Sequence, residues 1–353
     1  MVTGRPQVVM VHTIPGTANA VGGIINASRG NTPMLFTAGR TPLTEGSLPG
    51  SRDGGIHWAQ ESFDQGSMVR EWVKWDYELR SGSDLEGVVD RALAIATSQP
   101  QGPVYLTLPR EVLAERLDGF AYSDKPRMPA EGETGPAPAL IAQAAQALAR
   151  AKNPILITRV GGRDPRTVQP LVDLAELLGM AVLDAGAGFV NFPQDHPLYA
   201  GPNVARWLSE ADVVVVLEAD VPWPPKRVTP KVDAVVIGIG EDPLYKRYPI
   251  RGFPLDLALA GSPRLTLAAL RDAVKAIGVD AAATRQRAAR WEGESRMRRD
   301  SAEEQAHAAE AARPIAKAWF AHNLAGQLDE ATVVLNELGV DGSQFTFTTP
   351  GQF

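Results

Sequence analysis

The chain has 353 residues, more than the roughly 250–300 that one hydrophobic core usually accommodates, so two or three domains are expected. Its 41 Asp and Glu residues outnumber its 35 Lys and Arg residues, so no excess of positive charge favours nucleic acid or an anionic membrane as a partner. The absence of cysteine excludes disulfides, thiolate metal ligands and cysteine nucleophiles. No apolar run approaches the roughly 20 residues that span a bilayer, and no signal-peptide core is visible, so we expect a cytoplasmic protein.

The first part of the sequence alternates between strand-like and helix-like segments. Residues 8–11 form an apolar run suited to a buried strand, Pro15 and Gly16 break that run, and small residues then allow a helix to begin close to the turn. Further strand patterns lie at residues 33–37 and 104–108, and residues 85–97 have apolar side chains at helical spacing. The alternation predicts a parallel α/β sheet, with the Gly-, Ser- and Pro-rich residues 43–55 as a surface loop.

A proline-rich segment divides the chain. Residues 123–137 contain Pro126, Pro129 and Pro136 and are predicted to form an interdomain linker. Helical and strand patterns alternate again beyond it, which predicts a doubly wound, Rossmann-like domain over residues 138–280. The expected helices are residues 140–149, 168–179, 204–210 and 265–277, and the expected strands are residues 154–158, 181–183, 213–217 and 234–237.

The C-terminal part of the sequence is highly charged at first and then more apolar. Residues 285–312 are dense in Arg, Glu and Ala without a continuous apolar stripe, so we expect a solvated helix between two domains and assign residues 281–312 to it. Arg313 and Pro314 are predicted to begin another helix, because proline suits the first helical position. Its expected apolar face contains Ile315, Trp319, Phe320 and Leu324, and residues 332–335 are the next expected strand.

Five segments follow one another in a characteristic order: residues 11–23 (VHTIPGTANAVGG), 24–29 (IINASR), 31–40 (NTPMLFTAGR), 73–77 (VKWDY) and 101–109 (QGPVYLTLP). Together they resemble the pyrimidine-binding domain of thiamine-diphosphate-dependent enzymes of the acetolactate synthase, benzoylformate decarboxylase and pyruvate oxidase type. The resemblance continues through a middle domain to the end of the chain. It implies α/β architecture with parallel doubly wound sheets: a partial pyrimidine-binding domain at residues 1–122, a complete Rossmann-like middle domain and the beginning of a diphosphate-binding domain at residues 313–353.

The resemblance also identifies two motifs that the sequence lacks. The family's catalytic glutamate precedes the glycine turn, and only eleven residues precede His12; the Gly-Asp-Gly…Asn motif that holds magnesium and diphosphate belongs beyond Phe353. We therefore interpret the chain as a fragment that is inactive by itself and contains no metal ligand. For the full-length enzyme, the resemblance implies thiamine diphosphate and magnesium as cofactors, and a homodimer or homotetramer whose cofactors lie between subunits.

Three residues near the first strand are candidates for cofactor chemistry. His12 stands where benzoylformate decarboxylases carry an active-site histidine, and a histidine there can relay protons near neutral pH. The alternative is a strand-end histidine that only caps its neighbours. By the same resemblance Gly16 and Asn19 lie near the aminopyrimidine, where Gly16 permits close backbone approach and Asn19 offers donor and acceptor groups. The alternative for Asn19 is a helix N-cap.

The remaining candidates are assigned by position in the resembled family or, for the tryptophans, by their aromatic side chains. Arg40 stands where many relatives have glutamine and is a candidate for binding a substrate carboxylate, against the alternative of a solvated loop arginine. Four tryptophans are candidates for a hydrophobic pocket or, alternatively, for a core or subunit interface: Trp58, Trp72, Trp75 and Trp223. The first diphosphate-side loop is expected at Asn336, Glu337, Leu338 and Gly339.

Flavin is not expected in the middle domain. Gly161 and Gly162 follow its first strand without the complete G-x-G-x-x-G spacing, and residues 200–203 (AGPN) depart from the histidine-containing turn of flavin-binding acetolactate synthases. The predicted function is a thiamine-diphosphate- and magnesium-dependent decarboxylase or carboligase that acts on a 2-oxo acid and resembles acetolactate synthase. An aryl 2-oxo acid decarboxylase of the benzoylformate type is one alternative, although residues 220–225 (DVPWPP) lack that enzyme's second histidine. A non-catalytic nucleotide-binding or assembly module is another.

Overall fold

The chain divides into two compact units, residues 1–133 and 134–353, which are treated separately. The computed structural model describes residues 5–125, 127–186, 188–329, 331–335 and 340–352. The division falls within the predicted linker, and the described residues of 115–137 contain no helix or strand. Prolines in this segment remove backbone donors, which opposes regular structure.

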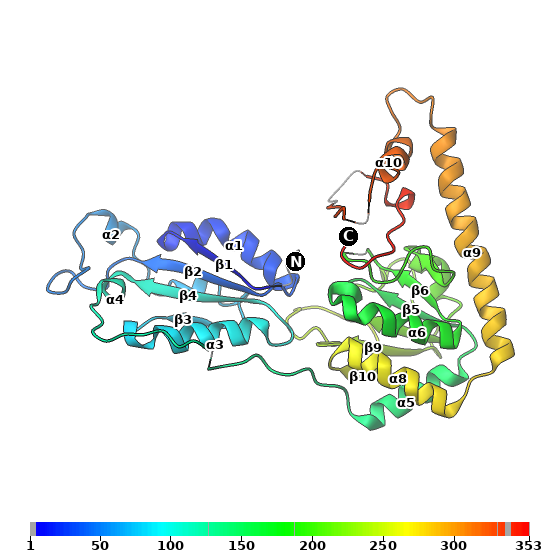
Figure 1. The fold of residues 1–353 in the computed structure, drawn as a ribbon, viewed down its shortest axis with the longest axis horizontal. Coiled ribbons are helices and arrows are strands. Elements are labelled where there is room, and N and C mark those ends of the chain that lie inside the picture. The colour runs from blue at the N-terminus through cyan, green and yellow to red at the C-terminus, as the bar shows by residue number, and fades with distance from the viewer. Residues whose placement is uncertain (1–4, 126, 187, 330, 336–339, 353) are drawn as a thin grey trace. The chain divides into compact units, whose positions relative to one another are not determined.

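The first unit is built on a four-stranded parallel sheet with helices on both faces (Figure 1). Its strands are β1 (Gln7–Val11), β2 (Met34–Arg40), β4 (Pro103–Pro109) and β3 (Asp76–Glu78), in that spatial order. Helix α1 (Thr13–Arg29) buries Ile24 on one face against Phe36 and Tyr105, and α3 (Leu85–Thr97) buries Ala92 and Ala96 on the other face. The remaining elements are α2 (Ile56–Ala59), α4 (Arg110–Ala114), η1 (Gly66–Met68) and η2 (Gly82–Asp84).

The predicted turn at Pro15 and Gly16 is wrong, because both residues lie inside the first turn of α1. Proline is tolerated there since the first backbone N–H groups of a helix have no intrahelical acceptor. Gly16 N already donates to His12 O at 2.9 Å, so the helix begins directly after the strand. The helix predicted at residues 85–97 is confirmed as α3, and residues 43–55 form a loop as predicted.

The second unit is a six-stranded parallel sheet in the order β10-β9-β8-β5-β6-β7. The order reverses between β5 and β8, so the parallel, doubly wound α/β fold class is confirmed. Its strands are β5 (Pro154–Thr158), β6 (Ala181–Asp184), β7 (Tyr199–Gly201), β8 (Val213–Leu217), β9 (Val235–Gly240) and β10 (Leu257–Ala260). Its helices are α5 (Pro138–Arg150), α6 (Val168–Leu178), α7 (Val204–Leu208), α8 (Pro263–Ile277), α9 (Ala281–Ala308) and α10 (Lys317–Ala325), with η3 (Gly161–Arg163), η4 (Pro165–Thr167) and η5 (Gly342–Gln344).

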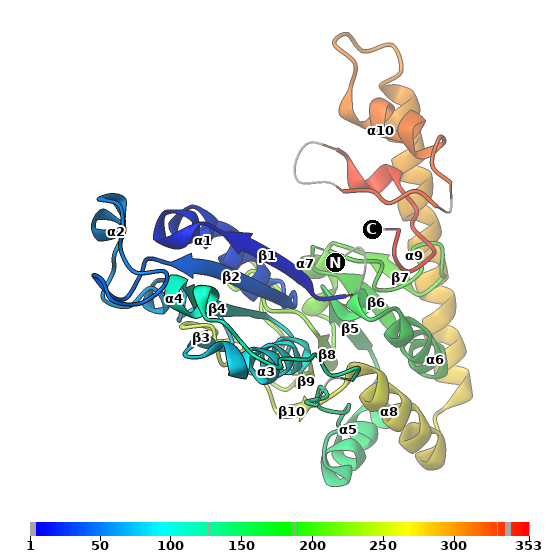
Figure 2. The same ribbon diagram turned by 60° about the vertical axis from the view of Figure 1, so that its left-hand side comes forward.

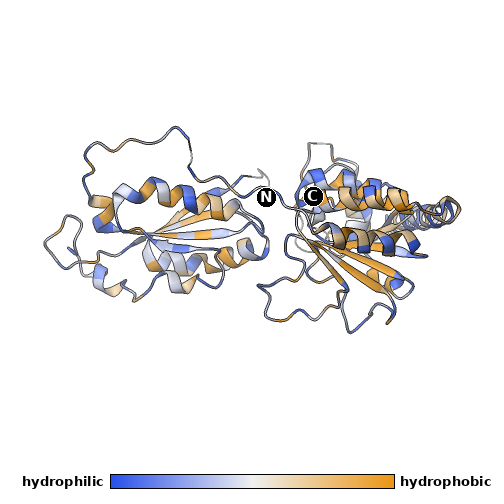
Figure 3. Ribbon diagram, turned by 90° about the horizontal axis from the view of Figure 1, so that it is seen from below, coloured by the Kyte–Doolittle hydropathy of each residue, from blue (hydrophilic) through white to orange (hydrophobic). Residues whose placement is uncertain are grey.

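The core of the second unit lies between its sheet and its helices. All residues of β5 and β8 are buried, and the helices α5, α6 and α8 bury one face each. In Figure 3 the strands of this sheet are mostly hydrophobic, whereas the helices beside them carry both hydrophobic and hydrophilic residues. Gly179 ends α6 in the left-handed conformation (φ 57°), and a Cβ there would lie 2.6 Å from Thr284 O of α9. Glycine therefore allows α6 to end against α9.

Helix α9 is not the free bridge that the sequence predicts. It runs along the second unit (Figure 2), buries Trp291 edge-on against Trp207 with ring centroids 4.9 Å apart, and donates from Arg287 Nε to Leu178 O at 3.0 Å. A few large contacts thus replace the missing apolar stripe.

The C-terminal predictions need two corrections. Helix α10 begins at Lys317 rather than at Pro314, and it buries Ala321 towards Phe345 and Phe347 while Ile315 and Phe320 are exposed. The expected strand at residues 332–335 does not form: no neighbouring strand pairs with it in the described part of the chain, and Val334 N donates instead to Gln352 O at 2.9 Å. Strands β7 and β10, both short edge strands, were not predicted.

Candidate active site at the carboxyl edge of the first sheet

The parallel register of the first unit gathers polar residues at one edge of its sheet. Val11 of β1 pairs with Ala38 of β2, Ala38 pairs with Thr107 of β4, and Thr107 pairs with Glu78 of β3. The residues that follow these positions therefore leave the sheet together at its carboxyl edge. Ligands bind at such edges in open α/β sheets. His12 and Arg40 both lie there.

His12 is the N-cap residue of α1, and its side chain is exposed. The side chain makes no capping hydrogen bond, which opposes the alternative that His12 only caps its neighbours. Thr13 follows with φ 46°, a left-handed conformation that is uncommon for a β-branched residue. Local strain of this kind persists only where the surrounding structure holds it, and it is concentrated at functional sites.

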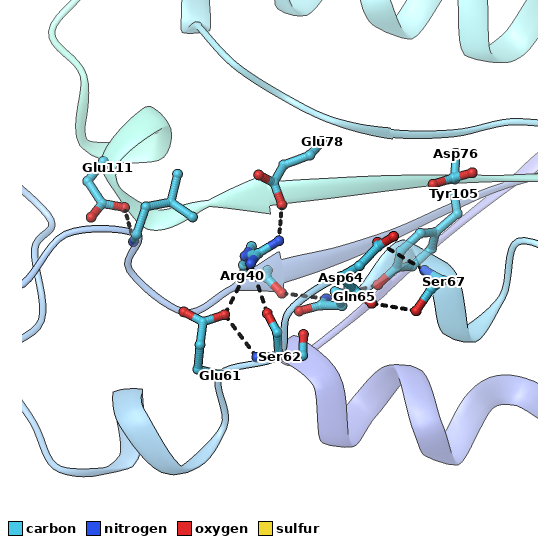
Figure 4. A network of polar contacts seen from close by, with 12 residues as sticks. Arg40, Glu61, Ser62, Asp64, Gln65, Ser67, Asp76, Glu78, Tyr105 and Glu111 are labelled. Carbon is cyan, nitrogen blue, oxygen red and sulfur yellow. Dashed lines mark hydrogen bonds and ion pairs between the residues drawn. The ribbon is translucent and has the colours of Figure 1, made fainter.

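A chain of buried hydrogen bonds holds the first turns of α1 against the sheet. The hydroxyl groups of Thr17 and Tyr105 lie 2.8 Å apart, and Gln65 Nε2 donates both to Tyr105 Oη (2.9 Å) and to Gly39 O (3.0 Å). Figure 4 shows Gln65 between Tyr105 and the end of β2. Thr13 Oγ1 adds a 3.3 Å hydrogen bond to Gln60 Oε1. Buried and satisfied, this network fixes where the helix and His12 emerge.

Gly16 and Asn19 occupy different environments. A Cβ at Gly16 would lie 2.8 Å from Val11 Cβ, so glycine is needed here for α1 to pack on the strand that precedes it. Asn19 lies in the second turn of α1 and is exposed. Its alternative interpretation as the N-cap is wrong because His12 holds that position.

Arg40 is largely buried and is held by protein groups. Its Nη1 donates to the carboxylate of Glu78, and its Nη2 donates to Glu61 Oε1 at 3.2 Å and to Ser62 O at 3.0 Å (Figure 4). The two Nη atoms are thus committed, which opposes a bidentate clamp on substrate. Three buried atoms nearby, Arg40 Nε, Thr41 Oγ1 and Ser62 Oγ, have no hydrogen-bond partner among the described residues. Buried polar atoms without partners are costly, and they mark places for a water molecule or a ligand.

The loop after β2 is braced rather than free. Arg52 donates to the carboxylate of Glu61 and to Pro42 O (2.9 Å). Glu111 accepts from Leu43 N at 3.0 Å and from Thr44 N at 2.8 Å. Burial alone would raise the pKa of Glu111, but these hydrogen bonds outweigh it and lower the pKa below its ordinary value.

The sequence did not identify Glu61, Gln65, Glu78 or Tyr105 as site residues. The run 60–65 (QESFDQ) is polar enough to suggest a surface, and only the fold shows that Gln65 is buried. The four tryptophans do not line one pocket: Trp58 is exposed, Trp72 and Trp75 pack on two different core clusters of the first unit, and Trp223 is buried in the second unit against Phe253.

Protein groups close the carboxyl edge of the second sheet around its glycine turn. A Cβ at Gly162 would lie 2.2 Å from Val190 O, and Gly162 N donates to Asn191 Oδ1 at 2.8 Å. Arg159 Nη1 and Asp220 Oδ1 form a 2.6 Å ion pair beside it. Burial raises the pKa of Asp220, but the hydrogen bond from Arg159 outweighs this effect and lowers it.

The diphosphate-side candidates Asn336, Glu337, Leu338 and Gly339 lie outside the described residues. Within the described ranges, no group of three or more His, Asp or Glu side chains is arranged to hold a metal ion. The same part of the chain contains no helix that is long and apolar enough to cross a membrane.

These features define a two-unit α/β protein whose first sheet presents polar side chains and a helix N-terminus at its carboxyl edge. Comparison with known families is specific: the N-terminal thiamine pyrophosphate (TPP) binding domain of thiamine pyrophosphate enzymes matches residues 1–68, and their central domain matches residues 141–270. The chain therefore belongs to the thiamine-diphosphate-dependent enzyme family.

Individual relatives agree with this family. Benzoylformate decarboxylase of Pseudomonas aeruginosa is 28% identical over 228 residues, which are 63% of this chain and 42% of that enzyme. A putative thiamin diphosphate-dependent enzyme from Mycobacterium smegmatis has a TM-score of 0.63 at 28% identity, over 77% of this chain and 51% of that one. Benzoylformate decarboxylase from Polynucleobacter necessarius has a TM-score of 0.64 at 26% identity, over 76% and 50% of the two chains. The chain thus spans about half the length of these relatives or less.

Proposed function

We propose that the chain supplies the pyrimidine side and the central domain of a thiamine-diphosphate- and magnesium-dependent enzyme that decarboxylates or ligates a 2-oxo acid. The observation that carries the proposal is the row at the carboxyl edge of the first sheet. There the exposed imidazole of His12, which makes no capping hydrogen bond, follows β1. The buried guanidinium of Arg40, whose Nε has no partner among the described residues, ends the neighbouring strand β2. Family membership supports thiamine diphosphate as the cofactor.

The residues of this edge suit the chemistry of 2-oxo acids. In our proposal His12 transfers a proton near neutral pH, as an imidazole does. Arg40 Nε, Thr41 Oγ1 and Ser62 Oγ are the donors for the substrate's carboxylate or carbonyl oxygen, while Glu61 and Glu78 hold the guanidinium in place. Arg40 thus keeps its predicted role of binding the substrate carboxylate, but through its Nε instead of its two Nη atoms.

The described residues fit one half of the cofactor. Asn19 is exposed in the second turn of α1, two turns after His12, and offers both donor and acceptor groups, so we assign it and the backbone at Gly16 to the aminopyrimidine. Asn336 to Gly339 remain our proposal for the diphosphate side. When bound, thiamine diphosphate supplies the electron sink that decarboxylation of a 2-oxo acid requires.

Our proposal includes two alternative reactions, acetolactate formation and benzoylformate decarboxylation. Acetolactate-synthase-like chemistry is the first, because the second histidine of benzoylformate decarboxylases has no counterpart at residues 220–225. The benzoylformate-type alternative is supported by exposed His12 and by the relative from Pseudomonas aeruginosa. Product analysis separates them: acetolactate from pyruvate supports the first, and benzaldehyde from benzoylformate supports the second. Binding of nucleotides without turnover of either acid would favour the non-catalytic alternative.

The test of the site uses His12→Ala in a protein that joins these residues to a diphosphate-binding domain of the kind found in the relatives. We expect kcat to fall by about 10²–10⁴ while the Kd for thiamine diphosphate changes less than about twofold, because general acid–base catalysis contributes in this range. His196→Ala, in the second unit, is the matched control and should leave kcat unchanged. Equal kcat values for His12→Ala and the unaltered protein would reject the assignment.

Asn19→Ala tests the cofactor half of the proposal. We expect the Kd for thiamine diphosphate to rise about tenfold through loss of one or two hydrogen bonds. Asn26→Ala is the control, since Asn26 is also exposed on α1 two turns further on. Equal Kd values for the two variants would reject the assignment of Asn19 to the cofactor.

We also propose that the protein binds no flavin and forms a homodimer or homotetramer. The absence of flavin is supported by the crowding of Gly162, because Val190 and Asn191 leave no room for a phosphate at that turn. Purified protein should be colourless, and yellow protein that releases stoichiometric flavin on denaturation would contradict this. Light scattering coupled to size-exclusion chromatography measures the assembly, and a monomer at micromolar concentration would contradict it.

A further inference from the structure

The second unit contains a cavity of about 720 Å³ that the proposed active site does not use. It lies between the ends of β6 and β7, helix α9 and the C-terminal segment, which Figure 2 shows on the same side of the unit. Arg159, Gly162 and Asp220, at the point where the strand order reverses, do not line it. The cavity is therefore separate from the crevice where doubly wound sheets usually bind nucleotides.

The cavity has the size and the walls of a small-molecule site. Such sites are typically about 300–1,000 Å³, mostly apolar, with a few polar groups that orient the ligand. The apolar walls here come from Trp207, Met297, Phe345 and Phe347, and the last two rings stack at 5.6 Å. Met297 is 57% exposed, so the cavity is accessible from solvent at this side chain.

Arg298 is the under-satisfied polar group of the cavity. Its guanidinium lies over the Tyr199 ring, 4.8 Å from the centroid, and its Nη2 makes a long hydrogen bond of 3.4 Å to Gln194 O. Its Nε is buried and has no partner among the described residues. Burial also lowers the pKa of Arg298, because desolvation disfavours the charged form. A guanidinium with five N–H donors and one weak hydrogen bond favours an anion beside it.

The other charged groups of the cavity have hydrogen-bond or ion-pair partners. Arg206 Nη2 and Glu294 Oε2 form an ion pair of 2.8 Å. The two oxygens of Asp184 accept from Asn191 Nδ2 (2.9 Å) and from Tyr199 Oη (3.0 Å). Asp184 attracts the charge of Arg298, but no hydrogen bond joins the two side chains among the described residues. Asp341 accepts from the backbone and hydroxyl of Ser343. Among the described residues that line the cavity, Arg298 is therefore the charged donor with the weakest hydrogen bonding. The carboxyl groups of Asp184 and Asp341 oppose a highly charged ligand such as a phosphate dianion.

We propose that this cavity binds an amphipathic organic carboxylate, with the carboxylate on Arg298 and the apolar body against Trp207, Met297 and the two phenylalanines. A monoanion matches the weakly hydrogen-bonded guanidinium of Arg298, and a hydrocarbon or aromatic body matches the walls. The site does not depend on the proposed active site, which lies in the other unit.

The test is isothermal titration of the full chain with 2-naphthoate, a planar carboxylate of suitable size. We expect saturable binding of 2-naphthoate. The neutral 2-naphthamide should bind the unaltered chain at least tenfold more weakly, and the Arg298→Met variant should bind 2-naphthoate at least tenfold more weakly. Arg296→Met is the matched control, because Arg296 is exposed on the same helix and does not line the cavity. It should bind 2-naphthoate within twofold of the unaltered chain. Circular dichroism establishes that both variants are folded.

A second pair of variants keeps the proposal testable if Arg298→Met fails to fold. Ser301 is exposed and lines the cavity, so Ser301→Glu adds a negative charge there and Ser301→Gln adds the same bulk without charge. We expect the glutamate variant to bind 2-naphthoate at least fivefold more weakly than the glutamine variant. The proposal is overturned by equal binding in the two Ser301 variants, by equal affinity for naphthoate and naphthamide, by equally tight binding of inorganic phosphate, or by no saturable binding at millimolar naphthoate.

Discussion

The two units cover their parallel sheets to different extents. In the second unit β5 and β8 are buried along their whole lengths, and one continuous core cluster extends over both faces of the sheet. The first unit has two smaller clusters on opposite faces, and β1 leaves Val8 64% and Met10 69% exposed while Val9 and Val11 pack towards α1. Parallel sheets are normally covered on both faces. The first unit therefore has a strand with one apolar face in water.

The second unit has the larger packed core, and the first unit has the candidate active site at its sheet edge. The exposed imidazole of His12 lies in the first unit, at the carboxyl end of a strand with one uncovered face, whereas the glycine turn of the second sheet is filled by Asn191 and Val190. Stability should therefore depend most on the second core, and function most on the first edge. Four sets of substitutions test this contrast.

The largest effect is expected in the second core. Leu156 is fully buried in the middle of β5, and Leu156→Ala should lower the free energy of unfolding by about 2–5 kcal/mol, because the cavity left in a packed core adds to the lost burial. Leu113→Ala, at a residue of the first unit that is 62% exposed, is the control and should cost less than about 0.5 kcal/mol. Urea unfolding followed by circular dichroism measures both, and equal values would remove the contrast.

The sequence predicted this core better than it predicted the edge. Strands β5 and β8 have the predicted bounds, as does helix α3 in the first unit, since long apolar runs and helical spacing depend on local sequence alone. His12 and Arg40 were found only through resemblance. Gln65 and Tyr105 were missed because a buried hydrogen bond between residues 40 positions apart leaves no local pattern. Strand 332–335 failed for the opposite reason: an apolar run becomes a strand only where another strand pairs with it.

A second prediction concerns pH and the buried Asp184. Burial raises the pKa of Asp184 to about 6, against 3.8 in the unfolded chain. The folded state thus binds more protons at Asp184 than the unfolded state does between these values, so the contribution of Asp184 to stability falls as the pH rises from about 4 to about 6 and is constant above that range. The change is on the order of 3 kcal/mol at about 1.4 kcal/mol per unit of pKa. Asp184→Asn should remove this slope, and an unchanged slope between pH 4 and 7 would contradict the assignment.

Two buried tyrosines, one in each unit, give a smaller and sharper comparison. Tyr105→Phe removes a hydroxyl that lies against Thr17 and Gln65, and we expect a cost of about 1–2 kcal/mol that is constant with pH, because its partners are neutral. Tyr199→Phe removes the donor to Asp184, so its cost should be larger above pH 6, where that carboxylate is charged, than at pH 4. Unfolding at the two pH values tests this, and parallel pH dependence of the two variants would contradict it.

The smallest effect on stability is expected on the open face of β1. Val8 and Met10 are already in water, so the double variant Val8→Thr, Met10→Thr should change the free energy of unfolding by less than about 0.5 kcal/mol. An exposed apolar strand at a sheet edge promotes association, so the same variant should remain soluble at higher concentration than the unaltered chain. Val9→Thr and Val11→Thr, on the packed face, are the matched controls and should lower stability without improving solubility. Sedimentation velocity over a range of concentrations measures association; if the double variant associates as strongly as the unaltered chain, β1 is not the surface responsible.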